Sequence, residues 1–96
     1  MRICVDFMGS FDLDFGAATV DIVIESPATV ATLLDHLAAH SVAGRRLRQA
    51  LTGGSSPRRR YILVSLDYVM LAPDTALETP LHNEARLCFA TPMVGG

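Results

Sequence analysis

One stretch of the chain has the apolar spacing of an amphipathic helix, and such a helix needs a second layer to pack against. Apolar residues recur there at the first, fourth, fifth, eighth and ninth positions, which places them on a single helical face. Either Ser26, with Pro27 at the first helical position, or Thr29 can cap the start. The apolar face consists of Val30, Leu33, Leu34, Leu37 and Ala38.

The second layer is predicted by segments in which apolar and polar residues alternate, as in a half-buried strand. Residues 2–8 and 19–25 alternate in this way and are predicted to form an antiparallel hairpin with a long connection. Residues 61–66 are too uniformly apolar to alternate, as expected of a central strand. We expect a short edge strand near Met70 and a last strand around residues 87–89.

The order strand, strand, helix, strand, short strand, strand predicts an α+β domain. A mixed sheet of four to five strands would pack one face on one main helix, which is the β-grasp (ubiquitin-like) pattern. Its first and last strands are parallel neighbours, so the end of the chain emerges from the centre of the sheet. A second, shorter helical turn is predicted at 43–51, and turns are predicted at 73–74 and 80–84. Because 96 residues bury a single core, we expect one β-grasp domain at 1–90 and a flexible tail at 91–96.

Charge and composition exclude several classes of function. A net charge of -2 and a pI near 5.8 give no overall field that would attract nucleic acid. All eight basic residues are arginine, which excludes a phosphate-binding loop that depends on lysine. No uncharged stretch approaches the ~20 apolar residues of a membrane span, and the apolar block after Arg2 is too short for a secretory signal. We therefore expect a cytoplasmic protein that binds neither nucleic acid nor membrane.

The residues that usually carry chemistry are sparse. Cys4 and Cys88 are the only cysteines, and neither belongs to a C-x-x-C pair, which excludes zinc ribbons and four-cysteine iron–sulfur sites. His36 and His40 have the spacing that can place two imidazoles on one zinc ion, but two ligands are too few and no metal site is predicted. No Ser-His-Asp or Cys-His motif is recognisable. We therefore expect no catalytic side chains in this chain.

Six of the eight arginines lie between residues 45 and 60, around a Gly-Gly-Ser-Ser loop. The favoured interpretation is a solvated loop whose charges keep it soluble. The alternative is docking on an acidic partner through Arg58, Arg59 and Arg60. Nucleic acid is the least supported partner, because no aromatic residues interleave the arginines.

Alternation also predicts which side chains face away from the helix. Cys4, Val23, Arg86 and Cys88 are expected on that face of the sheet. In a reducing compartment the two cysteines are expected to act as small apolar side chains. An apolar patch there would suit partner docking, because monomers seldom leave a large one uncovered.

The last six residues, 91–96, end in two glycines. Without Cβ atoms, Gly95 and Gly96 make a thin end that can thread a narrow channel and present a terminal carboxylate to another protein's active site. Pro92 restricts the backbone at the start of this tail, and Met93 and Val94 are expected to keep it extended in such a channel. A frayed end without function is the alternative.

The tail resembles the Pro-Pro-Val-x-Gly-Gly ending of the MoaD/ThiS family of ubiquitin-like sulfur carriers. Pro92, Gly95 and Gly96 match that ending, whereas Thr91 and Met93 depart conservatively. The resemblance covers most of the chain, including the opening hairpin, the helix start at 28–34, the turn at 73–77 and the last strand.

The resemblance implies a function for the terminal carboxylate. In this family an ATP-dependent, ubiquitin-activating-type enzyme (MoeB/ThiF-like) adenylates the terminal glycine, and sulfur transfer then makes a thiocarboxylate. Gly96 is therefore the implied reactive site, with no cofactor bound here because the partner enzyme uses the ATP. The position of Pro92 before the final four residues is more similar to MoaD than to ThiS. This implies the small subunit of a molybdopterin synthase, with the large subunit as partner.

Three alternatives stay open from the sequence. The chain could supply sulfur to another synthase, for thiamine, cysteine or a secondary metabolite, or it could be a ubiquitin-like protein modifier. It could also be a β-grasp binding module with an inert tail. Two positions depart from the family: Asp67 stands where an asparagine is frequent, and residues 82–85 replace the usual Asp-Gly-Asp turn. We expect Asn83 to take the left-handed conformation in that turn.

Overall fold

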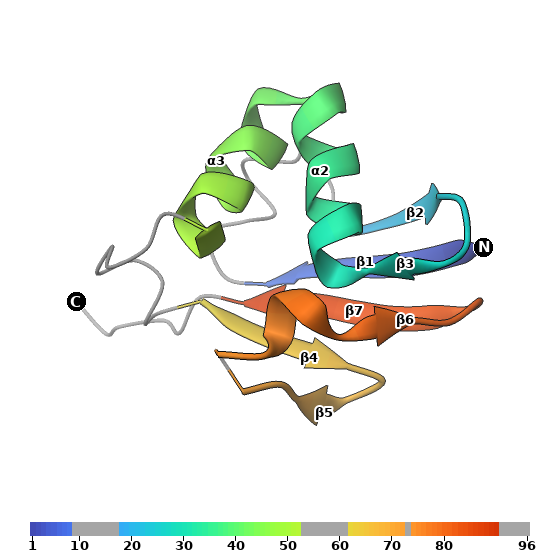
Figure 1. Cartoon of the computed structure of the whole chain (residues 1–96). Helices are drawn as coiled ribbons and strands as arrows, with labels where there is room; N and C mark the ends of the chain where they lie inside the picture. The colour runs from blue at the N-terminus through green and yellow to red at the C-terminus, as the bar shows by residue number, and fades with distance from the viewer. Residues whose placement is uncertain (9–17, 53–61, 73, 91–96) are drawn as a thin grey trace.

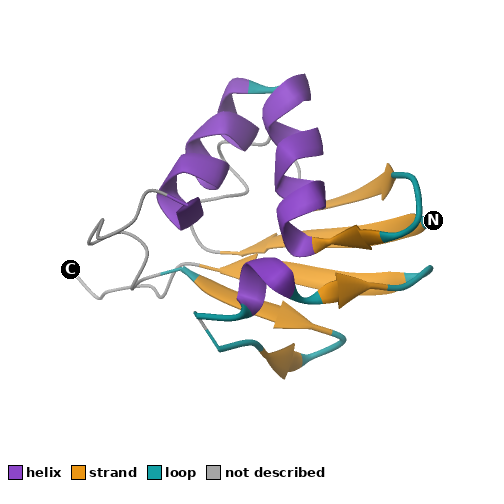
Figure 2. Cartoon of the chain, viewed as in Figure 1, coloured by secondary structure: helices purple, strands orange, loops and turns teal. Residues whose placement is uncertain are grey.

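The computed structural model describes residues 1–8, 18–52, 62–72 and 74–90. A five-stranded mixed sheet has the order β2-β1-β7-β4-β5, and the two long helices lie on one side of it (Figure 1, Figure 2). The predicted β-grasp architecture is confirmed. The elements are β1 (Arg2–Met8), β2 (Thr19–Val23), β3 (Ala28–Thr29), α2 (Val30–His40), α3 (Val42–Thr52), β4 (Leu63–Leu66), β5 (Val69–Met70), the 3-10 turn η2 (Ala76–Glu78), β6 (Pro80–Leu81) and β7 (Ala85–Ala90).

The first and last strands are parallel neighbours, as predicted. Ile3 lies opposite Ala85 and Phe7 lies opposite Phe89, with the two phenyl rings stacked at 6.3 Å between centroids. On the other side of β7, β4 pairs antiparallel, so β7 occupies the middle of the sheet. The residues that alternate toward the helices are buried on these strands, which places the core between sheet and helices.

Helix α2 covers this core with the predicted face. All five residues of the apolar face are buried. Thr29 caps the helix: the Thr32 N–H donates to the Thr29 hydroxyl, and the Thr29 N–H donates to the Thr32 hydroxyl. The alternative start at Ser26 is therefore wrong. The cap satisfies backbone donors that have no partner inside the first turn, so the helix begins at Val30.

The short helical turn expected after α2 is a full helix. α3 has 11 residues, as α2 does, so the layer contains two helices instead of one main helix. Leu47 and Leu51 are buried one turn apart, together with Gly44. A Cβ on Gly44 would lie 2.1 Å from the carbonyl oxygen of Leu37, so this close approach to α2 requires glycine.

Among the described residues, no helix is long and apolar enough to cross a membrane.

The turn predicted across residues 80–84 contains a strand. Pro80 and Leu81 form β6, which pairs antiparallel with β3 beside the start of α2. Proline is accepted there because a two-residue edge pairing does not need its missing N–H. Leu81 is buried against the core, which a local turn prediction cannot anticipate.

The turn before β7 also differs from its prediction. Glu84 adopts the positive φ, at 67°, and Asn83 does not. The Asn83 side chain instead accepts a hydrogen bond from the Arg2 N–H at 2.8 Å, while Arg2 pairs with Glu84 at 2.9 Å. The side chains of Asn83 and Glu84 therefore both fix the turn to Arg2 of β1.

Candidate functional site

The candidate site is the sheet face turned away from the helices, which we call the outer face. In the parallel pairing of β1 with β7, Cys4 lies beside Arg86 and Asp6 lies beside Cys88. Val23 lies at the sheet edge on β2, with 72% of its side chain exposed. The register thus places the four predicted outer residues on one face. Their role in partner binding stays a prediction.

Large apolar side chains that the sequence analysis missed extend this face. Met8, Leu63, Tyr68 and Met70 are exposed by 58%, 41%, 81% and 58%. Alternation along β1 is a signal that could have found Met8, whereas the strands around Tyr68 are too short to show a period. An open depression of about 270 Å³ lies here. It is lined by Asp6, Met8, Ser65, Tyr68, Met70, Arg86 and Cys88.

An ion pair lines this depression. Arg86 donates from Nε to Oδ2 of Asp6 at 2.6 Å and from Nη2 to Oδ1 at 3.0 Å, and the Thr19 hydroxyl donates to Oδ1 at 2.8 Å. Burial by itself raises the pKa of Asp6, but the hydrogen bonds from Arg86 and Thr19 outweigh it and lower the pKa below its usual value. Asp6 is therefore ionised, and the outer face presents a neutralised pair at this point.

The two cysteines contribute neutral thiols to the outer face. Both are free, and burial raises the pKa of each thiol. Because Cys4 is in register with Arg86, it is offset by two residues from Cys88 on the adjacent strand. Two residues along a strand span about 6.6 Å and neighbouring strands lie about 4.8 Å apart, so the two Cα atoms are separated by about 8 Å, more than the ~7 Å that a disulfide can span. The thiols therefore suit the predicted role of small apolar side chains.

The turn between β4 and β5 forms one rim of the depression and has an unusual backbone. Asp67 and Tyr68 have φ angles of 50° and 69°, a region that favours glycine and asparagine. The Asp67 N–H donates to the Arg86 carbonyl at 2.8 Å, and the Arg86 N–H donates to Oδ1 of Asp67 at 2.9 Å. The Arg86 guanidinium carbon lies 5.9 Å from the centroid of the Tyr68 ring, a cation–π distance.

His82, in the turn before β7, contacts the same carboxylate. Its Nε2 lies 2.5 Å from Oδ2 of Asp67, and its Nδ1 lies 2.9 Å from the carbonyl oxygen of Asn83. Both partners are hydrogen-bond acceptors, so the protonated ring, with an N–H on each nitrogen, satisfies both. The bond to Asp67, followed by that to Asn83, raises the pKa of His82. The backbone N–H of Arg86, followed by His82, lowers the pKa of Asp67.

The last described residue, Ala90, lies beside the apolar part of this face. β7 ends at Ala90, which lies opposite Met8 on one side and Leu63 on the other. Both of these neighbours have exposed side chains on the outer face. The predicted tail residues Pro92, Met93, Val94, Gly95 and Gly96 lie outside the described residues, as do Arg58, Arg59 and Arg60.

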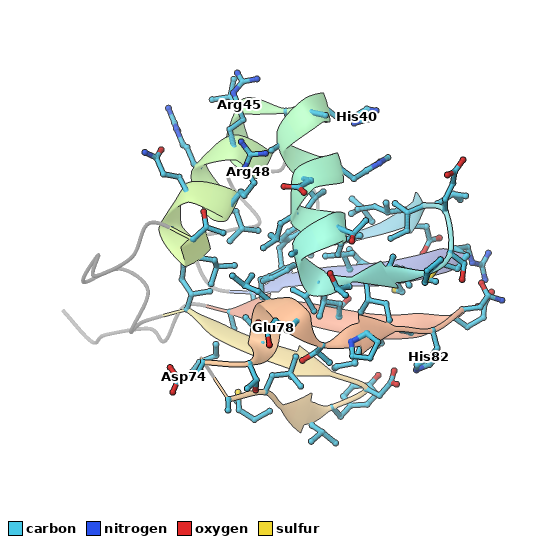
Figure 3. All side chains as sticks on the ribbon, in the orientation of Figure 1. His40, Arg45, Arg48, Asp74, Glu78 and His82 are labelled. Atoms are coloured by element: carbon cyan, nitrogen blue, oxygen red, sulfur yellow. The ribbon has the colours of Figure 1, made fainter. Side chains whose placement is uncertain are left out.

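The helical layer carries the histidine pair and part of the arginine group. His36 and His40 stack on α2 with 4.3 Å between ring centroids. Within the described ranges, no three potential ligands gather into a metal-binding group. Figure 3 shows Arg45 and Arg48 on α3, and Arg48 pairs with Asp35 at 3.3 Å. These groups lie on the side of the sheet opposite the outer face.

Comparison with solved structures identifies the fold family. The crystal structure of SAMP1 from Haloferax volcanii matches with a TM-score of 0.75 and 21% identity, over 100% of both chains. The chain has the ubiquitin-like β-grasp fold. The putative molybdopterin converting factor subunit 1 from Pyrococcus furiosus matches with a TM-score of 0.66 and 10% identity, over 97% of this chain and 99% of that one.

A further match comes from a complex of subunits 1 and 2 of the molybdopterin-converting factor from Helicobacter pylori. Its TM-score is 0.60 at 17% identity, over 100% of both chains. No family model and no curated protein matches the sequence. These ubiquitin-like neighbours agree with the resemblance to the MoaD/ThiS carriers, and they confirm it at the level of the fold.

Proposed function

We propose that this β-grasp chain is a sulfur carrier whose carboxylate at Gly96 is adenylated and converted to a thiocarboxylate. The observation that carries the proposal is the position of Ala90. It ends the central strand beside the exposed Met8 and Leu63, directly before the segment that resembles the carrier tail. A partner docked on the outer face could therefore receive that tail in its own active site.

The proposed chemistry needs only the chain terminus from this protein. The Gly96 carboxylate attacks the α-phosphate of ATP and releases pyrophosphate, which gives an acyl adenylate. Hydrosulfide, as the sulfur donor, then attacks the acyl carbon and displaces AMP, which leaves a thiocarboxylate and a released proton. Adenylation converts a poor leaving group into a good one, and docking supplies proximity. The partner in the first step is a MoeB/ThiF-like adenylating enzyme, which also uses the ATP.

The intact mass of the protein isolated from its own host tests this proposal. A gain equal to the exchange of one oxygen for sulfur, mapped to the C-terminal peptide, is the expected result. The matched control is the Gly96 deletion, which should carry no sulfur. If the wild-type chain carries no sulfur and forms no adenylate with its activating enzyme, the carrier function is wrong.

A protein modifier is the second candidate, and the match to SAMP1, a small archaeal modifier protein, favours it. A modifier shares the adenylation step but transfers its acyl group to an amine on another protein. The chain contains no lysine, so it cannot build lysine-linked polymers on itself. Single conjugates on other proteins, without ladders of this chain, would support the modifier over the carrier.

Molybdopterin synthesis is the pathway we propose for the sulfur. The fold match to subunit 1 of a molybdopterin-converting factor in complex with subunit 2 supports a synthase large subunit as partner. Thiocarboxylated protein mixed with the large subunit from the same host should convert the pterin precursor to the dithiolene product. If the sulfur moves only when a thiazole synthase or a cysteine-forming partner is supplied, the molybdenum assignment is wrong.

A further inference from the structure

One histidine joins three elements at the rim of the outer face. His82 belongs to the turn before β7, its Nε2 contacts Asp67 in the β4–β5 turn, and Asp67 in turn bonds the Arg86 N–H of β7. Figure 3 shows His82 beside the sheet, away from His40 on the helical layer. This contact adds to the two hydrogen bonds between Asp67 and the Arg86 backbone, and it ties the β4–β5 turn to the segment between β6 and β7.

Loss of the ring proton would break this arrangement. A neutral imidazole has one N–H, whereas Asp67 and the Asn83 carbonyl both require a donor from it. Deprotonation therefore leaves one acceptor facing a lone pair. Asp67 and Tyr68 both occupy the left-handed region, so the conformation of this turn depends on the contacts around it.

The residues that this turn positions line the outer depression. Tyr68 follows Asp67 directly and stacks near the Arg86 guanidinium, and Met70 follows on β5. We propose that His82 is a positioning residue for docking: its charged ring holds the β4–β5 turn so that Tyr68 and Met70 present a fixed apolar surface to the adenylating enzyme. Docking weakens when the ring loses its proton. This inference rests on the proposed function, which supplies the partner.

The other charged groups around His82 are held in ion pairs. Glu84, in the same turn, pairs with Arg2 of β1 at 2.9 Å, and Asp6 of β1 pairs with Arg86 of β7. Asp67 has a lowered pKa, and the pKa of each outer-face thiol is raised. The raised pKa of His82 sets the direction, so docking is strong below that pKa and declines as the pH rises through it.

The first test needs no partner. A pH titration followed by NMR would monitor the His82 ring, the Tyr68 ring and the Arg86 amide. We expect the Tyr68 and Arg86 signals to shift with the same midpoint as the His82 ring. In His82→Ala that transition should disappear, and the control His40→Gln should leave it unchanged. If Tyr68 and Arg86 do not follow His82, the positioning role is overturned.

Asp67→Asn separates charge from geometry. Asparagine tolerates the left-handed backbone and its Oδ1 still accepts from the Arg86 N–H, so the turn should persist. Without the carboxylate, the titration midpoint of the His82 ring should fall toward the ordinary histidine range. The Tyr68 signals should no longer shift with that titration. An unchanged midpoint in this variant would contradict the inferred contact.

The second test uses the activating enzyme from the same host, with affinity measured at pH 6 and pH 8.5. Between these two pH values the affinity of the wild type should fall at least about threefold more than the affinity of His82→Ala. The variant corrects for titration of the enzyme itself. Equal pH dependence in both proteins overturns the role in docking. If neither protein binds at either pH, the proposed function fails, and the NMR titration still decides whether His82 positions the turn.

Discussion

Arg86 and Asp6 are 80 residues apart in the chain, yet the Arg86 Nε lies 2.6 Å from Oδ2 of Asp6. The pair exists because β1 and β7 are parallel neighbours and both side chains project from the outer face. It places a bidentate, charge-neutral contact among exposed apolar side chains. A docking partner therefore meets an apolar surface whose partly exposed carboxylate is already paired.

Acid should weaken the fold through Asp6. Its folded-state pKa is depressed below 3.8, so its contribution to stability is present above pH 3.8 and is lost as the pH falls through the folded pKa. Urea unfolding between pH 6 and pH 2.5 should show a smaller loss of stability for Asp6→Asn than for the wild type. Asp35→Asn, which removes a largely exposed carboxylate, is the control. Equal acid sensitivity of Asp6→Asn and the wild type would contradict the prediction.

Val23→Asp should weaken binding to the activating enzyme more than it lowers the melting temperature. Val23 is exposed on the outer face, so the substitution costs little in the folded monomer but places a charge in the proposed interface. Val42→Asp is the matched control, because Val42 is also exposed but lies on α3. A large fall in melting temperature with unchanged binding would show that position 23 acts through stability.

The glycine tail should be necessary for activation and unnecessary for folding. Deletion of Gly96, or Gly95→Val, should abolish pyrophosphate exchange with the cognate adenylating enzyme. The valine side chain blocks a narrow channel, and the deletion withdraws the terminal carboxylate by one residue from the reacting position. The melting temperature should stay at the wild-type value in both variants. Wild-type exchange by the truncated chain would disprove the proposed site.

Leu33→Ala should destabilise the protein by about 2–5 kcal/mol, because truncation of a fully buried leucine leaves a cavity. Leu33 has 0% exposure in the core between α2 and the sheet. The free energy of unfolding from urea titration is the measurement, and Ala39→Ser on the exposed side of α2 is the control. A loss no larger than that of the control would mean that the core lies elsewhere.

Gly44→Ala should cost about 1–3 kcal/mol, because its Cβ would overlap the Leu37 carbonyl and push α3 away from α2. Gln49→Ala on the exposed face of α3 should be close to neutral. Urea unfolding compares the two, and hydrogen exchange in α3 should rise only in Gly44→Ala. A stable Gly44→Ala variant would show that the helices can separate at little cost.

Local periodicity determined much of this architecture. The alternation around Ile3 and Val5, the apolar face of α2 and the parallel placement of the last strand all follow from burial of one core by segments of period 2 and 3.6. Burial repeats with the period of the helix or strand, so the apolar pattern within the segment's own sequence shows which residues are buried. The tail motif is contiguous and is therefore visible in the sequence, and its role stays a prediction.

Tertiary structure alone decided the remaining features. The full length of α3 depends on how closely Gly44 approaches α2, and the strand at Pro80 depends on its pairing with β3. The contact of His82 with Asp67 joins residues from separate turns, and Asp67 meets Arg86 only because β4 lies beside β7. Such contacts are set by the register between strands distant in the chain, which no local pattern encodes.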